Sequence, residues 1–206
     1  MFDLGYPEIS PEAVALHSLE ECKAHLENTG PRNLYIFSAA CSAHRAVQSA
    51  LTVALAGSAN IGASPEKVRK QWLEYFERDF DERPRSTPGF RVMSLRQLAA
   101  EATTRPLPWS KHPLGMSAQE GFFLMRLASY RDDFEHPKQL TYLVTIREVA
   151  RAIAAAVPLV SRSLEEVRHH TYELLPSASS IVRQIEQLCA QLAFEEEQRI
   201  SRDQPI

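Results

Sequence analysis

The sequence predicts an all-α protein, an up-and-down helical bundle, on three observations. Apolar residues recur with a helical period along most of the 206 residues, and the alternation typical of β-strands never persists beyond a few residues. The chain has only 7 glycines, too few for a sandwich with many tight turns. With 44% hydrophobic and 24% charged residues it can bury a sizeable core.

Three helices are expected in the first part of the chain: 10–28, 31–57, and a third that begins at Ser64. The first opens with Ser10 as N-cap and Pro11 at the first helical position. The second carries small residues at 38–43, which let a neighbouring helix approach closely, so it is expected to be central. The third repeats the capping signature as Ser64-Pro65-Glu66.

The helical pattern is interrupted between residues 79 and 115, where prolines and glycines break the chain into loops around one short helix near 94–102. Irregular excursions of this length are often functional, although a surface connection is the simpler interpretation. Over residues 66–91 the basic and acidic residues nearly cancel, which favours a solvated face. The arginine-rich end, from Arg83 to Arg91, is the best candidate in this region for contact with a nucleic acid.

Helical periodicity resumes at Ser117, which forms a capping box with Glu120. A break is expected near Pro137, because proline lacks an N–H and disfavours helical geometry at the residue before it. The helices expected after that break are a long one at 137–157 and shorter ones at 163–175 and 177–199. The chain therefore divides into an N-terminal helix (1–30), a helical core (31–160) and a C-terminal helical extension (161–206).

Composition and motifs exclude several classes of protein. The net charge of −3 excludes a general polycation, so binding of a nucleic acid would need a local basic surface. The sequence has no GxGxxG, Walker A, GxSxG or HExxH motif, and no signal peptide or membrane span is expected, so a cytoplasmic location is the default. We expect no metal and no cofactor, since the His17–Glu21–His25 stripe and the pair Glu166 and His169 are more typical of a solvated surface.

The three cysteines are far apart and form no CxxC pair, so neither a disulfide framework nor a zinc knuckle is expected. Cys22, Cys41 and Cys189 all lie inside helical patterns. We therefore predict that they act as small buried hydrophobic residues.

One segment, Ser129 to Pro137, has residues that suit phosphodiester chemistry. On a continuous helix Arg131 and His136 would point about 140° apart, but a corner at Pro137 could bring them side by side. His136 would then stand at the N-terminus of the long helix, whose dipole attracts anions. Arginine binds phosphate oxygens through a planar fork, and a neutral histidine can take the proton of a ribose 2′-hydroxyl. The 2′-oxygen would then attack the adjacent phosphate with no metal.

The run Arg131-Asp132-x-x-x-His136 resembles the Arg-polar-x-x-x-His motif of HEPN domains, helical bundles common in prokaryotic toxin–antitoxin, phage-defence and CRISPR systems. The resemblance covers residues 31–160 and implies a metal-independent endoribonuclease, a homodimer with the two motifs facing each other, and a possible antitoxin partner. It implies that Arg131 binds or polarises the phosphate, His136 acts as base or acid, and Asp132 orients one of them. Further RNA-binding charge is expected from Lys138, Arg126 and Arg85.

The alternative is a non-catalytic helical module that binds another protein. Arg131 would then form local salt bridges with Asp133 or Glu135 at a helix end, and His136 would only cap that helix. This interpretation predicts that the Arg131 and His136 side chains diverge or make unrelated contacts. It also predicts an apolar groove elsewhere on the molecule.

Overall fold

The computed structural model describes residues 9–30, 34–136 and 144–203, and those residues form helices with no β-strand among them. The prediction of an all-α helical bundle is therefore confirmed. In chain order the elements are α1 (Pro11–Glu27), α2 (Tyr35–Ala56), α3 (Glu66–Glu77), the 3₁₀ helix η1 (Phe80–Glu82), α4 (Leu95–Thr104), α5 (Ala118–Glu135), α6 (Ile146–Ala156), α7 (Pro158–Glu165), α8 (Arg168–Thr171) and α9 (Leu175–Asp203). Among the described helices, none is both long and apolar enough to cross a bilayer.

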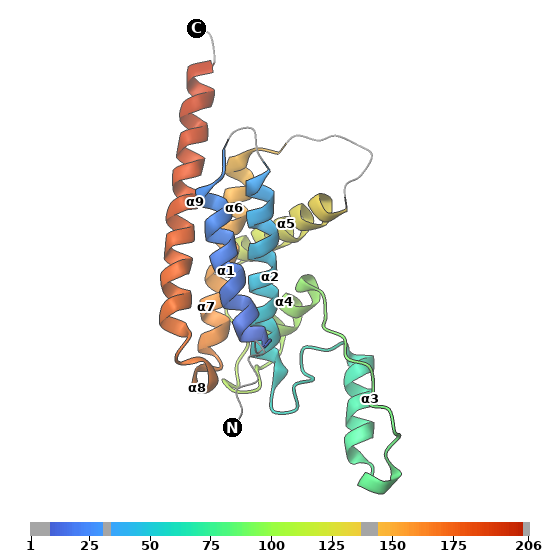
Figure 1. Ribbon diagram of the computed structural model, residues 1–206. Coiled ribbons are helices and arrows are strands. Elements are labelled where there is room, and N and C mark those ends of the chain that lie inside the picture. The colour runs from blue at the N-terminus through green and yellow to red at the C-terminus, as the bar shows by residue number, and fades with distance from the viewer. Residues whose placement is uncertain (1–8, 31–33, 137–143, 204–206) are drawn as a thin grey trace, which may run out of the picture.

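Helix α2 is the central helix, as its small residues predicted. Ala39, Ala40, Ala43 and Ala46 are completely buried, because side chains this small let α1 pack along most of its length. The other faces of α2 contact α4, α5, α6 and α7 (Figure 1). Within α2 only Tyr35 and Arg45 are exposed, and its other side chains are buried or half-buried among the neighbouring helices.

Helix α9 covers one side of the bundle and continues beyond it at its C-terminal end (Figure 1). It packs against α6, α1 and α7, and its buried side chains are spaced at helical intervals: Ala178, Val182, Ile185 and Cys189. Cys22 on α1 is buried as well, which confirms the interpretation of both cysteines as small hydrophobic residues. Burial raises the pKa of the Cys189 thiol to about 12, so this thiol stays protonated at neutral pH.

The helix predicted at 137–157 begins later than expected. Residues 137–143 lie outside the described part of the chain, Val144 and Thr145 are not helical, and α6 starts at Ile146. The reason is a capping box: the Thr145 side chain accepts a hydrogen bond from the Glu148 backbone N–H, and the Glu148 side chain accepts one from the Thr145 backbone N–H. Thr145, rather than the residues around Pro137, therefore marks the start of α6.

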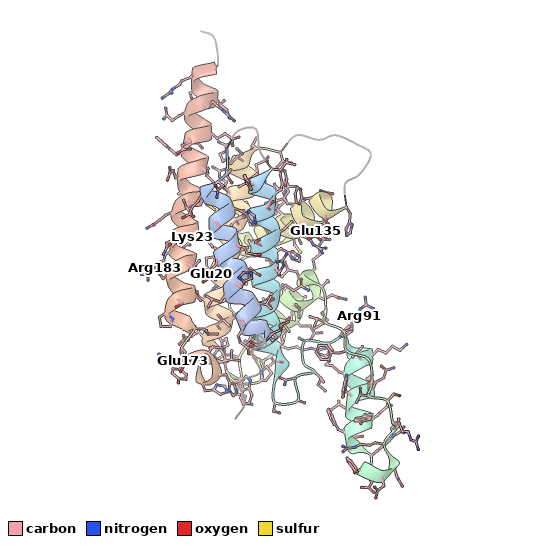
Figure 2. All side chains as sticks on the ribbon, viewed as in Figure 1. Glu20, Lys23, Arg91, Glu135, Glu173 and Arg183 are labelled. Atoms are coloured by element: carbon pink, nitrogen blue, oxygen red, sulfur yellow. The ribbon has the colours of Figure 1, made fainter. Side chains whose placement is uncertain are left out.

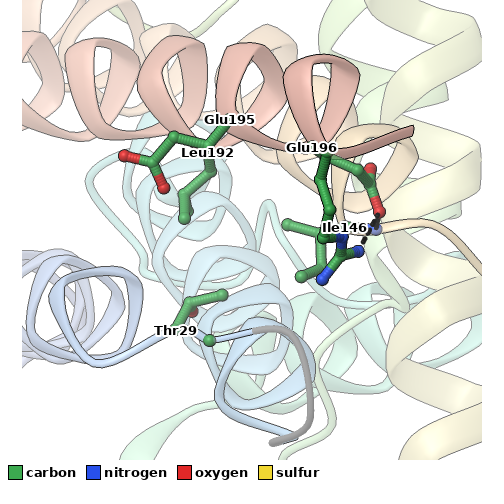
Figure 3. Close-up of a pocket in the computed structure, with 7 residues that line it drawn as sticks. Thr29, Ile146, Leu192, Glu195 and Glu196 are labelled. Atoms are coloured by element: carbon green, nitrogen blue, oxygen red, sulfur yellow. Dashed lines mark hydrogen bonds and ion pairs between the residues drawn. The ribbon is translucent and has the colours of Figure 1, made fainter. Parts of the chain in front are cut away.

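A side chain from α9 completes the N-terminus of α6. The Glu196 carboxylate, 8% exposed, accepts a hydrogen bond from the backbone N–H of Ile146 at 3.2 Å (Figure 3) and another from that of Arg147 at 2.7 Å. Beside it lies a pocket of about 150 Å³, between Leu192 and the end of α1 at Thr29. A negative charge at this end of a helix also interacts favourably with the helix dipole, so Glu196 fixes α9 against α6.

The helix predicted at 163–175 does not form with those bounds, since α7 and the short α8 occupy this part of the chain. Ser163 does not cap a helix: it is buried inside α7, which runs from Pro158 to Glu165. The chain then turns through Val167 into the short α8 before α9 begins. Arg162 fixes α7 to the start of α5 by an ion pair with Glu120, the glutamate of the predicted capping box at Ser117.

Residues 65–91 form an arm that projects from the bundle (Figure 1). Helix α3 has no buried residue, and the return segment leads through η1 back toward α4. The neck is closed by a hydrogen bond from the Met93 backbone N–H to the Ala63 carbonyl oxygen at 3.0 Å. Pro65 occupies the N-cap position of α3, and the Ser64 hydroxyl makes no capping bond, so the predicted cap is wrong. The fold therefore consists of a packed bundle and one projecting arm.

Candidate functional site

The motif identified from the sequence lies at the C-terminal end of α5. The helix continues through Glu135, and the chain leaves it at His136, whose φ and ψ are −127° and 70°. The His136 backbone N–H donates to the Asp132 carbonyl oxygen at 3.0 Å. His136 is thus a C-cap of α5 and not the N-cap of the next helix. The prediction that His136 lies at the positive end of a helix dipole is therefore wrong, because a helix C-terminus carries partial negative charge and repels anions.

Arg131 is held by two acidic residues of its own helix. Its guanidinium pairs with Asp132 Oδ1 at 3.0 Å and with a Glu135 carboxylate oxygen. Partial burial opposes the charge on Arg131, but the Asp132 hydrogen bond and the Glu135 charge raise its pKa, so the group stays cationic. Asp132 therefore orients Arg131, and the predicted salt bridge to Glu135 is present.

Within the described residues, no contact joins Arg131 to His136. The helix remains intact through Glu135, and side chains five positions apart on a helix point about 140° from each other. His136 is exposed at the helix end, while Arg131 is partly buried. A single chain therefore does not place the arginine and the histidine together.

The structure places a different histidine beside Arg131. His44 of α2 is only 9% exposed, and it lies close enough to Arg131 for the two groups to affect each other electrostatically. A second contact shows the same pairing of α2 with α5: the Phe37 and Phe134 rings stack with their centroids 5.7 Å apart. Phe37 lies about two turns before His44 on α2, and Phe134 lies about one turn after Arg131 on α5. Sequence analysis missed His44, since its relation to Arg131 depends on how two distant helices pair.

The environment of His44 keeps its ring neutral. Burial, followed by the Arg131 charge, lowers the pKa of His44 to about 4. Its neighbour Cys41 is half-buried, and burial together with the Glu135 charge raises the pKa of the Cys41 thiol to about 11. At neutral pH both side chains are therefore uncharged. We name this group the α2–α5 polar cluster; its members are Cys41, His44, Arg45, Arg131, Asp132 and Glu135.

The cluster extends to α1 through Arg45. The Arg45 guanidinium pairs with Glu21 at 3.1 Å, and Glu21 is in turn 3.5 Å from the His17 ring. His25, the third member of the stripe considered for metal binding, stacks on Tyr35 instead, with ring centroids 5.9 Å apart. Among the described residues, no group of three or more potential ligands is placed to hold a metal ion.

Of the three residues expected to supply RNA-binding charge, the two that the structure describes, Arg126 and Arg85, do not lie together. The Arg126 guanidinium donates to the Tyr130 hydroxyl at 2.8 Å and lies over the ring of the same tyrosine. Arg85 is exposed on the arm, away from α5, and Lys138 lies outside the described residues. An arginine that sequence analysis missed lies nearer the motif: Arg96 of α4 donates to the Ser129 hydroxyl of α5 at 3.2 Å.

No family model matches the sequence, and no match is found among curated proteins or among solved structures. The functional argument therefore depends on the residues themselves. The site that they form is a charged guanidinium at a helix end, oriented by two carboxylates, with a neutral buried imidazole on one side and an exposed imidazole at the helix terminus.

Proposed function

We propose that this protein is an endoribonuclease that cleaves RNA by 2′-hydroxyl attack and needs no metal. The observation that carries the proposal is the Arg131-Asp132-x-x-x-His136 motif at the accessible end of α5, with Arg131 already oriented by Asp132. The motif resembles that of HEPN domains, which favours a toxin or phage-defence role, a homodimer and a cognate antitoxin. The all-helical fold is compatible with that resemblance.

In the proposed reaction Arg131 exchanges Glu135 for a phosphate and binds two of its oxygens, which neutralises charge on the phosphorus centre. His136 takes the proton of the 2′-hydroxyl, and the 2′-oxygen attacks the adjacent phosphorus. The bond from phosphorus to the 5′-oxygen breaks, and that oxygen receives the proton from His136. The products are a 2′,3′-cyclic phosphate and a 5′-hydroxyl.

Because α5 separates Arg131 from His136 within one chain, the proposed site is shared between two copies of the protein. In a symmetric dimer each interface residue occurs twice, so Arg131 of one protomer can meet the partner's His136 at each of two equivalent positions. This arrangement needs no break in α5. It also agrees with the homodimer that the resemblance implies.

The test is cleavage of a labelled single-stranded RNA in the presence of EDTA. Wild-type protein is expected to release fragments with 2′,3′-cyclic phosphate ends, and Arg131→Ala and His136→Ala to reduce the rate by roughly 10²-fold or more. Arg183→Ala and His17→Ala are matched controls, because both side chains are exposed and lie on other helices. Cleavage that both motif variants leave unchanged would remove these residues from the active site.

One observation favours the second candidate, a non-catalytic module that binds a protein. The positive charge of Arg131 is already balanced by Asp132 and Glu135, which is the local ion pairing expected of a structural helix end. A purified protein that neither cleaves nor binds RNA, and forms a complex with a protein made from a neighbouring gene, would support this candidate.

A further inference from the structure

Aromatic side chains of α3 pack against one another in the arm. The Trp72 and Phe76 ring centroids lie 5.4 Å apart. Arg83 clamps the return segment onto α3: its guanidinium donates to the Phe76 and Arg78 carbonyl oxygens, both at 3.1 Å, and lies over the Tyr75 ring. An isolated helix as short as α3 has marginal stability in water. These contacts therefore stabilise α3, which has no packed core around it.

Between α3 and the return segment lies a groove of about 380 Å³. One wall is formed by Gln71, Glu74 and Tyr75 of α3 together with its C-cap Arg78, and the other by Pro84 and residues 86–89. At Gly89 an added Cβ would meet no atom within 4 Å, so the groove is open there. Its volume is at the lower end of the range for ligand pockets, which suits one planar group rather than a folded partner.

Positive charge leads from this groove toward α5. In the described part of the chain Arg78, Arg85 and Arg91 make no ion pair, whereas bundle arginines such as Arg45 and Arg147 pair with carboxylates. Figure 2 labels Arg91 near the neck of the arm and Glu135 at the end of α5. Arg96 of α4 donates to the Ser129 hydroxyl on α5 and has only that neutral partner among the described residues. The acidic residues of the arm tip lie in and beside η1, at the opposite end from the neck.

We infer that the groove of the arm holds one guanine base of a single-stranded RNA whose backbone passes Arg91 and Arg96 toward Arg131. Tyr75 and Arg78 in the groove lining combine an aromatic ring with an arginine that makes no ion pair in the described part of the chain, which is the combination found on single-strand binding surfaces. The base must be unstacked to enter the groove, which excludes duplex RNA. The Glu74 carboxylate only accepts hydrogen bonds, and guanine offers it two adjacent N–H donors. The inference rests on the proposed function, which makes RNA the substrate, and it adds the sequence preference.

The experiment measures binding of wild-type protein to two fluorescent oligonucleotides, an oligouridylate and the same oligomer with one central guanine. Both are made as 2′-O-methyl RNA, which 2′-hydroxyl attack cannot cleave. We expect the guanine oligomer to bind about tenfold tighter, the discrimination typical of one bidentate contact to a base. Glu74→Gln and Gly89→Phe, which fills the groove, are each expected to abolish the preference. Glu77→Gln is the matched control, since Glu77 is on the same helix but outside the groove.

Equal affinity for the two oligomers, or a preference that survives both groove variants, would overturn the inference. The absence of binding to either oligomer would also overturn it. If removal of the arm then reduced the number of subunits per particle in solution, the arm would be a protein interface instead. Binding is measured without cleavage, so an inactive protein that still prefers the guanine oligomer would contradict only the proposed reaction. A protein that cleaves RNA but does not prefer the guanine oligomer would contradict only the inference that the groove binds guanine.

Discussion

At the scale of single residues, the α2–α5 polar cluster shows how burial and charge set a protonation state. The His44 ring is nearly inaccessible, and the charged groups that face it are Arg45 from α2 and Arg131, Asp132 and Glu135 from α5. Burial and the two arginines disfavour a protonated ring, while the two carboxylates favour it less strongly. His44 is therefore neutral in the folded protein over most of the physiological pH range.

This pKa predicts a pH-dependent stability. Above pH 6.5 the His44 ring is neutral in both the folded and the unfolded chain and contributes nothing. Between pH 6.5 and about 4 the unfolded chain binds a proton that the folded protein does not, so the free energy of unfolding falls as the pH falls. The full shift corresponds to a loss of at most about 3 kcal/mol.

Urea denaturation at a series of pH values measures this effect. His44→Gln, which cannot titrate, is expected to flatten the pH dependence across that window, and His17→Gln, an exposed control, to leave it unchanged. An equally steep loss of stability in the His44→Gln protein would show that another group is responsible.

At the scale of elements, α6 depends on a side chain from another helix. Glu196 accepts hydrogen bonds from the first two N–H groups of α6, which otherwise have no partner within that helix. Glu196→Gln keeps the shape but removes the charge and one acceptor, so we expect a loss of about 1–3 kcal/mol in the free energy of unfolding.

The matched control is Glu197→Gln, since Glu197 is the next residue and makes an exposed ion pair with Arg147. We expect that variant to lose less than about 1 kcal/mol in urea denaturation. Equal losses in the two variants would contradict the capping role of Glu196.

The predictability of the elements follows from where their signals lie. Ser10, Ser94 and Ser117 cap helices with residues three positions away, so sequence analysis located those helix starts correctly. Thr145 carries the same kind of signal, but the apolar period before it continued and led to an earlier predicted start. Ser163 failed as a cap because tertiary packing buried it within α7.

The candidate site was predicted only in part, because some of its contacts are local in the sequence and others depend on tertiary packing. Arg131 and its carboxylates are neighbours on one helix, so their ion pairs follow from helical spacing. The position of His44 depends on the register between α2 and α5, and the projection of the arm depends on the absence of a partner for α3. Neither property can be read from the residues of one segment.

At the scale of the whole molecule, few contacts join the arm to the bundle. Helix α3 has no fully buried residue. Besides the bond from Met93 to Ala63 at the neck, the arm contacts the bundle through Arg69, which pairs with Glu101 of α4 at 3.7 Å and donates to the Gly62 carbonyl oxygen at 3.1 Å. Replacement of residues 65–91 by a short glycine–serine linker is therefore expected to change the free energy of unfolding by less than about 1 kcal/mol.

Circular dichroism and thermal denaturation test this expectation. Leu98→Ala is the contrasting variant, because Leu98 on α4 is completely buried and its truncation is expected to cost about 2–5 kcal/mol. An arm deletion as damaging as Leu98→Ala would show that the arm supports the bundle.

The proposed division of the active site between two protomers makes one measurement decisive. Arg131→Ala and His136→Ala proteins, each inactive alone, are mixed under conditions that exchange subunits, and RNA cleavage is then assayed in EDTA. Half of the dimers formed at random contain one copy of each variant, and each such dimer has one intact site out of two, so about a quarter of wild-type activity is expected. A mixture that exchanges subunits but remains as inactive as its two components would contradict the account.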